Sequence, residues 1–291
     1  MGIIVNNIKP IHIMFNGVEA TLYHNGIKIW PEDTDPYNPL NLPPNTVRVR
    51  TRDGLVPYKS GTDSSSTYET ATLVSGTTDV YDVYKSGTDF YNLFYNSNNV
   101  VEVLGANTTG ITNMNSMFSY CTLLTSVALF DTSSVTDMYF MFYYCLALTS
   151  VPLFNTSSVT NMSYMLSNCV SLTTVPLFDT SSVTDMECMF NNCGSLTTVP
   201  LFNTSNVENM YETFRGCSSL TSVPLFNTSS VTFMDSMFLN CTKVQSGALA
   251  LYQQASTQAN PPSSHTEAFK NCGSDTTTGA AELAQIPEDW K

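Results

Sequence analysis

Charged side chains are scarce in this sequence, and basic ones are the scarcest. Of 291 residues only 12% are charged, and 11 Lys and Arg are outnumbered by 24 Asp and Glu, for a formal net charge of -13. Binding to nucleic acid or to an anionic membrane needs a basic surface that contacts phosphate groups. We therefore expect no nucleic acid and no membrane among the partners.

A long apolar run and a secretory leader are also missing. No segment approaches the roughly 18 consecutive apolar residues that a membrane-spanning helix needs. The first residues, MGIIVNNIKPIHIMFNGVEA, do not combine a positively charged start with a long apolar run, as a signal peptide does. We therefore expect neither a transmembrane segment nor a signal peptide, and delivery to any extracellular surface by a route other than general secretion.

Patterns for catalysis or metal binding are absent too. The sequence has no C-x-x-C pair, and no Ser or Cys can be assigned to a nucleophilic site with one of the three histidines and an acidic residue. One column could bind calcium in principle, but calcium prefers several carboxylates and most of its members are Asn, which favours a ladder of turns. This column is Asp131, Asn155, Asp179, Asn203 and Asn227. We expect no enzymatic activity, no metal and no cofactor.

What the sequence has in abundance is a repeat with a period of 24 residues. Methionines and aromatic residues keep this step beside a column of cysteines, namely Cys121, Cys145, Cys169, Cys193, Cys217 and Cys241. A unit of this length cannot bury its apolar side chains alone, so neighbouring units must stack, with strands about 4.8 Å apart. The sequence therefore predicts a leucine-rich-repeat-like solenoid of short strands and short helical turns, with ladders of like residues as its core.

The unit at 148–171 shows the expected local structure. Its opening, LTSVPL, has the L-x-x-L-x-L pattern of a short strand, and the NTSS that follows predicts a turn. The apolar spacing from Val159 to Cys169 predicts a short helical turn, with Asn161 as its N-cap.

Degenerate units extend the array at both ends. FYNLFYNS at 90–97 matches the core positions of the next unit, and HTEAFKNC at 265–272 is a last coil displaced by a seven-residue insertion. The tail GAAELAQIPEDWK predicts a short helix that closes the stack. The expected organisation is a β-meander anchor at 1–31, a Pro-rich linker with a β-rich segment at 32–78, the solenoid at 79–246, and a divergent last coil with a helical cap at 247–291.

The repeat resembles a known family. Its units follow L-x-x-V-P-L-F-[DN]-T-S-x-V-x-x-M-x-x-M-F-x-x-C over roughly residues 79–272. This pattern is similar to the BspA-like leucine-rich repeats of bacterial surface proteins, which also occur in proteins of gut bacteriophages and prophages. The resemblance implies a curved solenoid used for adhesion. The sequence departs from the general leucine-rich consensus after Leu153, where Ser157 and Ser158 replace the usual N/C-x-L ending.

The N-terminal segment alternates apolar and polar residues around Asn-Gly pairs at 16–17 and 25–26. Asn-Gly between such runs is a strong hairpin signal, so we expect a three-stranded meander that ends at Pro31. A sheet this small is only marginally stable and should pack on a partner or self-associate as a homo-oligomer. The NGVE…NGIKIW pattern resembles segments of phage structural proteins, which implies attachment to a virion structural protein through residues 1–31.

Most cysteines are explained by the repeat. The ladder column, which Cys272 continues, places them beside Met and Phe, where a buried free thiol acts as a small apolar side chain. Cys188 alone lies off this column, and we expect it to be an exposed free thiol.

Two pairs of columns vary between units, and helical spacing directs them away from the core. They are rich in Tyr, Phe, Ser, Asn and Gly, which is the composition of an adaptable recognition surface, although single exposed aromatics are also common on ordinary surfaces. The candidate ligand-binding residues are Tyr120, Tyr139, Phe140, Tyr143, Tyr144, Tyr164, Asn168, Asn191, Asn192, Tyr211 and Arg215.

We therefore expect a non-enzymatic adhesion protein displayed on a phage or prophage virion, which binds a host surface glycan or protein through these residues. One alternative is a bacterial cell-surface adhesin with the same solenoid, and another is a purely structural virion decoration or spacer protein. Capsid or tail genes beside this one would favour the virion, and a leader or wall anchor upstream would favour the adhesin.

Overall fold

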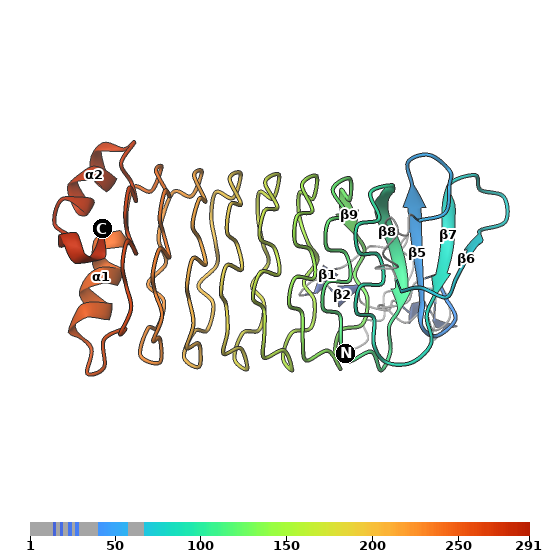
Figure 1. The fold of residues 1–291 in the computed structure, drawn as a ribbon. Coiled ribbons are helices and arrows are strands. Elements are labelled where there is room, and N and C mark those ends of the chain that lie inside the picture. Colours follow the sequence, from blue (N-terminus) through green and yellow to red (C-terminus); the bar gives the residue numbers. More distant parts are fainter. Residues whose placement is uncertain (1–13, 16–17, 20–22, 25–26, 29–39, 58–66) are drawn as a thin grey trace.

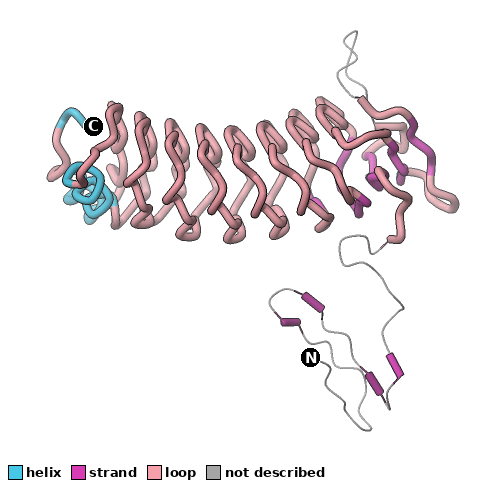
Figure 2. The backbone as a smooth tube through the Cα atoms, turned by 90° about the horizontal axis from the view of Figure 1, so that it is seen from below, coloured by secondary structure: helices cyan, strands magenta, loops and turns pink. Residues whose placement is uncertain are grey.

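The computed structural model describes residues 14–15, 18–19, 23–24, 27–28, 40–57 and 67–291. The chain winds into a row of coils, with a β-sheet at one end and helices at the other (Figure 1). Seen from below, the row consists almost entirely of loops and turns (Figure 2). The protein therefore has a repeat fold with few helices.

The N-terminal strands form two short antiparallel pairs. β1 (Met14–Phe15) pairs antiparallel with β2 (Val18–Glu19), and β3 (Tyr23–His24) pairs antiparallel with β4 (Ile27–Lys28). Each pair flanks one Asn-Gly dipeptide; these dipeptides, Pro31 and the first part of the linker lie outside the described residues. The described strands thus form two separate two-stranded sheets, where we expected one three-stranded meander.

A five-stranded sheet with the order β6-β7-β5-β8-β9 precedes the coils and continues into them. It consists of β5 (Thr46–Thr51), β6 (Thr70–Leu73), β7 (Val80–Tyr84), β8 (Val100–Asn107) and β9 (Ser126–Val127). All pairs are antiparallel except β8 with β9, which are parallel. Because β8 pairs with β5 on one side and with β9 on the other, the sheet and the coils share one core. The sheet includes β7 and so continues past residue 79, where we expected the coils to begin.

Hydrogen bonds between neighbouring coils hold the stack together. In the unit at 148–171, alternate backbone N–H groups donate to carbonyl oxygens of the next coil at 2.7–3.1 Å. The donors are Met162, Tyr164, Leu166 and Asn168. The N–H groups between them donate to carbonyl oxygens within the same coil and so close turns. These donors are Met165, Ser167 and Cys169. With the N–H of Ser163, which donates to Oδ1 of Asn161, every backbone donor of residues 162–169 is therefore satisfied, and none depends on a helix.

The apolar segment of each coil is a chain of turns. The helical turn predicted from the spacing of its apolar residues is therefore a wrong prediction. Every fourth residue has a positive φ, such as 57° at Tyr164 and 62° at Asn168, which an α-helix excludes. Ser, Thr, Asn and Val dominate this segment and are weaker helix formers than Ala, Leu or Glu. Asn161 still caps the segment as predicted, but in an Asx turn, because its Oδ1 accepts the N–H of Ser163 at 2.9 Å.

The side-chain alternation at the start of each coil also departs from the leucine-rich pattern. Val151 is buried, but Leu153 is 54% exposed and the next residue, Phe154, takes the core position. The N–H of Phe154 donates to the carbonyl oxygen of Pro152 at 2.9 Å, and this three-residue turn shifts the alternation by one residue. Leucines at the same position of the following coils are exposed in the same way, namely Leu177, Leu201 and Leu225.

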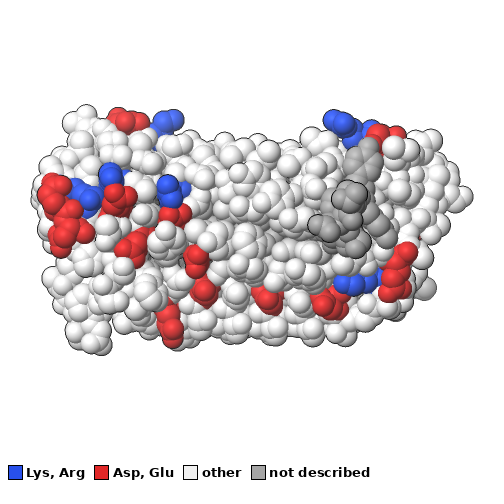
Figure 3. All heavy atoms as spheres, in the orientation of Figure 1, with Lys and Arg blue, Asp and Glu red and all other residues white. Residues whose placement is uncertain are grey.

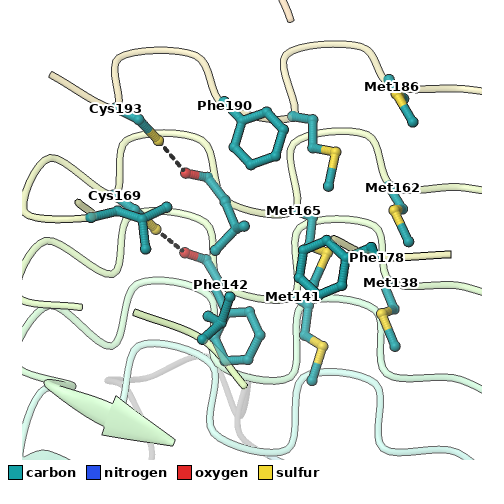
Figure 4. Packing of buried hydrophobic residues seen from close by; sticks show 14 of the residues in the cluster. Met138, Met141, Phe142, Met162, Met165, Cys169, Phe178, Met186, Phe190 and Cys193 are labelled. Carbon is teal, nitrogen blue, oxygen red and sulfur yellow. Dashed lines mark hydrogen bonds between the residues drawn. The ribbon is translucent and has the colours of Figure 1, made fainter. Parts of the chain in front are cut away.

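The core consists of ladders of Met, Phe and Cys (Figure 4). Phenylalanine rings of successive coils stack, as Phe118 does on Phe142 with 5.5 Å between ring centroids. The thiol of Cys169 donates to the carbonyl oxygen of Phe142 in the preceding coil at 3.2 Å. All eight cysteines are free and buried, and burial raises the pKa of Cys169 to about 12. The ladder cysteines are therefore protonated core side chains at neutral pH, as the sequence predicted.

Helices close the C-terminal end of the stack (Figure 1). The insertion before the last coil forms α1 (Ala248–Thr257), and the tail forms α2 (Thr277–Leu283) and the 3₁₀ helix η1 (Glu288–Trp290). The ring of Trp290 stacks on His265 of the last coil at 4.0 Å, which covers the open end of the core. Among the residues that the structure describes, no helix is both long and apolar enough to cross a membrane.

Leu177 and Phe178 provide a test of the shifted alternation. Leu177→Ser should change the free energy of unfolding by less than about 0.5 kcal/mol, because this leucine is 60% exposed. Phe178→Ala should lower it by about 3–5 kcal/mol, because this ring is buried in the core. Urea denaturation followed by circular dichroism measures both changes, and equal losses would contradict the shifted alternation.

The cysteine ladder predicts unfolding in mild alkali. Burial raises the pKa values of Cys145 and Cys169 in the folded state. Above about pH 8.5 the unfolded chain loses thiol protons that the folded chain keeps, so stability falls by about 1.4 kcal/mol per pH unit for each buried cysteine. The urea midpoint should therefore drop steeply between about pH 9 and pH 11. The double variant Cys145→Ala, Cys169→Ala should show a shallower drop, and a parallel drop would show that these thiols do not cause it.

Candidate functional site

Aromatic side chains gather on the surface of the first coils. We call this set the aromatic patch, which comprises Tyr91, Tyr95, Tyr120, Tyr139, Phe140, Tyr143, Tyr144 and Tyr164. Ring contacts cross from coil to coil: Phe140 stacks on Tyr164 at 4.6 Å between centroids, and Tyr120 stacks on Tyr144 at 5.2 Å. Tyr143 meets Phe140 edge to face at 4.7 Å. The structure thus brings together all the aromatic candidates that the sequence indicated in adjacent coils.

Four of these rings stand on backbone positions that disfavour them. The φ values of Tyr120, Phe140, Tyr144 and Tyr164 lie between 56° and 61°, in the left-handed region. This region costs roughly 1–2 kcal/mol for most residues with a Cβ atom and is best tolerated by Gly and Asn. In the column of Tyr120 and Tyr144, the other coils have Asn96, Asn168, Asn192, Gly216, Asn240 and Asn271. The two tyrosines therefore stand where the backbone favours another residue, which is typical of functional positions.

A slot of about 370 Å³ opens within the patch. Two coils that flank a third contribute its aromatic walls, with Tyr91 and Tyr95 on one side and Tyr139, Phe140 and Tyr143 on the other. The coil between them contributes Tyr120 and the smaller side chains Asn115, Ser116 and Ser119. The slot therefore lies where one coil carries small residues between two aromatic neighbours, and none of its lining side chains is charged.

The patch presents neutral hydroxyl groups. Burial raises the pKa of Tyr143 to about 12, and the neighbouring Tyr120 adds to this effect. Burial also raises the pKa of Tyr164, as does the hydrogen bond that its hydroxyl donates to Oε1 of Glu187 at 2.6 Å. Both hydroxyls therefore stay protonated at neutral pH. Charged side chains are also sparse on the face drawn in Figure 3. They lie mainly at the two ends and along one edge.

A polar cluster of Glu187, Cys188, Asn191, Glu212 and Arg215 continues the patch along the stack. Glu212 accepts hydrogen bonds from Nδ2 of Asn191 at 2.7 Å and from the Arg215 guanidinium at 2.6 Å. Two expectations fail here, because Cys188 is only 3% exposed and Asn191 is also buried. The left-handed backbone at Cys188, with φ 52°, places its Sγ 3.8 Å from Glu212 of the next coil, so the thiol is covered.

The remaining candidates lie further from the slot. Nδ2 of Asn192 donates to Oδ1 of Asn168 at 3.2 Å, which continues a ladder of amides. Tyr211 is 38% exposed, and its ring contacts no other described aromatic ring. The sequence-based selection missed Tyr91 and Tyr95, although they precede Asn115 and Ser119 by one period. Extending the variable columns into the degenerate first coil would have found them.

This surface is suited to noncovalent binding. Ring faces, hydroxyl groups and amides dominate it, and these groups bind by packing and hydrogen bonding. Among the described residues, no three His, Cys, Asp or Glu side chains come together where they could hold a metal ion.

The coils match one protein family. The family described as "Mycoplasma protein of unknown function, DUF285" matches residues 88–198 and residues 173–274. No curated protein matches the chain. A leucine-rich repeat protein from Eubacterium ventriosum, known from a crystal structure, is similar at 21% sequence identity and a TM-score of 0.38. This similarity covers 64% of the present chain and 43% of that chain, so it spans less than half of the solved protein.

Tyr144→Asn tests the backbone strain in the patch. The substitution removes ring contacts worth about 0.5–1.5 kcal/mol but relieves a left-handed backbone by a similar amount. The free energy of unfolding should therefore change by less than about 1 kcal/mol. Tyr143→Asn removes a ring from a residue that is not left-handed and should cost about 1 kcal/mol more. Equal losses in urea denaturation would show that Tyr144 is not strained.

Proposed function

The chain belongs to the DUF285 family of unknown function, and from this premise we propose that it is a non-enzymatic surface-binding protein whose aromatic patch contacts the ligand. The repeat family suggests surface binding or adhesion in general. We assign this binding to the aromatic patch.

The observation that carries the proposal is the presence of aromatic rings on left-handed backbone. Tyr120 and Tyr144 occupy a column in which Asn and Gly serve the fold elsewhere, so the rings are not needed for the coil itself. Tyrosine offers a large, rigid contact area with little loss of side-chain entropy on binding. Clustered aromatic residues are also those that dominate the affinity of protein interfaces.

The carrier that we propose is a phage or prophage virion, with the ligand a host surface glycan or protein and with residues 1–31 as the anchor. The two antiparallel strand pairs in the N-terminal segment support this proposal, since such short elements gain stability by packing on a partner. A bacterial cell surface is the alternative carrier. Antibodies against the chain should label purified virus particles, and labelling of intact bacterial cells alone would overturn the virion assignment.

The chain itself supplies the substitutions that test the patch. Tyr139→Ser, Phe140→Ser, Tyr143→Ser and Tyr144→Asn give one coil the residues that other coils have in these columns. The combined variant should therefore keep the fold, as circular dichroism and urea denaturation can establish. Binding of the fluorescently labelled protein to bacterial cells, epithelial cells and immobilised mucin is then measured by titration. We expect saturable binding by the wild type and a loss of roughly tenfold or more in the variant, because hot-spot aromatics are removed.

Tyr211→Ser is the matched control, because Tyr211 occupies the column of Tyr139 outside the slot. It should leave binding unchanged. Equal binding by the four-residue variant and the wild type would count against the patch. Absence of saturable binding to every surface would favour a structural spacer or decoration protein.

A further inference from the structure

The slot in the aromatic patch has the dimensions of a site for one flat ring. Its walls, Tyr91 on one side and Tyr139 with Phe140 on the other, come from coils that are two steps apart in the stack. At about 4.8 Å per step the backbones of these coils are about 10 Å apart, which leaves space for one ring between the aromatic side chains of the two coils. The middle coil places Asn115 in this column, where its neighbours have tyrosine.

One end of the slot is closed by an aromatic ring. The ring of Tyr120 lies between those of Tyr95 and Tyr143, with centroid distances of 5.6 and 5.3 Å. In this part of the patch the middle coil therefore fills the gap. In the column of Tyr91 and Tyr139 it does not, so the slot is bounded on three sides and open to solvent.

The floor of the slot carries an oriented hydrogen-bond donor. Oδ1 of Asn115 accepts the hydroxyl of Ser116 at 2.7 Å, and the backbone N–H of Asn115 donates to Oδ1 of Asn113 at 2.9 Å. The first bond orients the carboxamide, and the second fixes the backbone that carries it. Its Nδ2 makes no hydrogen bond to another described residue, so two N–H bonds are available to an occupant.

The lining decides the charge of the occupant. All nine lining residues are Tyr, Phe, Asn or Ser, and a charged group that enters between the walls would lose water without gaining an ion pair. The nearby carboxylates of Asp137 and Glu187, which accept hydrogen bonds from Tyr139 and Tyr164, are not among the residues that line the slot. The occupant should therefore be neutral.

The faces and edges of the occupant follow from the walls and the floor. Aromatic faces carry partial negative charge and attract the positively polarised C–H bonds of a flat apolar face. The Asn115 amide and the tyrosine hydroxyls suit an occupant with a rim of hydroxyl groups. A pyranose ring combines a C–H face with a hydroxyl rim and carries no charge in neutral sugars.

We propose that the slot formed by Tyr91, Asn115, Tyr139 and Phe140 binds one pyranose ring of a neutral glycan. The ring stacks between the aromatic walls and accepts a hydrogen bond from Nδ2 of Asn115. This proposal rests on the proposed function and specifies the ligand class of the same patch.

Saturation-transfer NMR on the full chain tests it with small probes. The probes are methyl glycosides of glucose, galactose, mannose and N-acetylglucosamine, with methyl glucuronide, N-acetylneuraminic acid and choline as charged counterparts. We expect at least one neutral glycoside to receive saturation, most strongly at the C–H protons of one ring face. Tyr91→Ser and Tyr139→Ser should each weaken its binding roughly tenfold or more, because each removes one wall. Asn115→Asp should weaken it as well, because it removes the donor and keeps the oxygen that Ser116 contacts.

Tyr211→Ser is again the control and should leave the dissociation constant unchanged. Transfer to none of the neutral glycosides, preferential binding of choline or of a charged sugar, or full binding by the Tyr91→Ser variant would each overturn the proposal. Loss of cell or mucin binding in the four-residue variant, together with no neutral glycoside binding, would leave the proposed function standing and reject the pyranose. Neutral glycoside binding without binding to any cell surface or mucin would support the pyranose site and reject the proposed surface-binding function.

Discussion

The hydrogen-bond register between coils is the constraint on which the rest of the structure depends. In residues 162–169 the backbone donors alternate between the next coil and the same coil. This alternation is accompanied by a left-handed residue at every fourth position, as at Tyr164 and Asn168. Each coil completes the backbone bonds of its neighbours, so a coil alone has no stable structure. The first and last coils lack a neighbouring coil on one side, and the sheet and the helices at the two ends cover them (Figure 1).

The same register divides the side chains into two classes. Inward columns are restricted by packing, which keeps them at Met, Phe and Cys, whereas the outward left-handed columns are restricted only by the backbone. Asn and Gly meet that restriction without strain, and larger residues need support from their neighbours. Phe140 obtains it by stacking on Tyr164, and Glu212 obtains it from Asn191 and Arg215. Bulky outward residues thus occur in groups across adjacent coils, and such groups form continuous surfaces.

Much of this fold could be predicted from the sequence, because a ladder repeats its evidence in every coil. The period, the buried cysteine column and the degenerate coils at both ends follow from spacing alone. The local conformation could not be predicted in this way. Helices and the observed chain of turns both return side chains to the core after three or four residues, so Met162 and Cys169 fit either one. The recurrent Asn and Gly in the column of Tyr120 and Tyr144 are the signal that distinguishes the chain of turns from a helix, because these residues favour left-handed backbone.

The candidate site was predictable in part for a related reason. Variation between coils identified Tyr139, Phe140 and Tyr143, but the slot depends on the contrast between successive residues of one column, which appears only when the column is followed from coil to coil. Asn115 becomes a floor only because Tyr91 and Tyr139 stand on either side of it. In a stack with a fixed backbone, the sizes of successive residues in one column set the depth of the surface: a small residue between two large ones leaves a slot. The position and shape of the slot are therefore a property of the order of coils, and exchanging two coils would move or remove the slot without changing any residue within them.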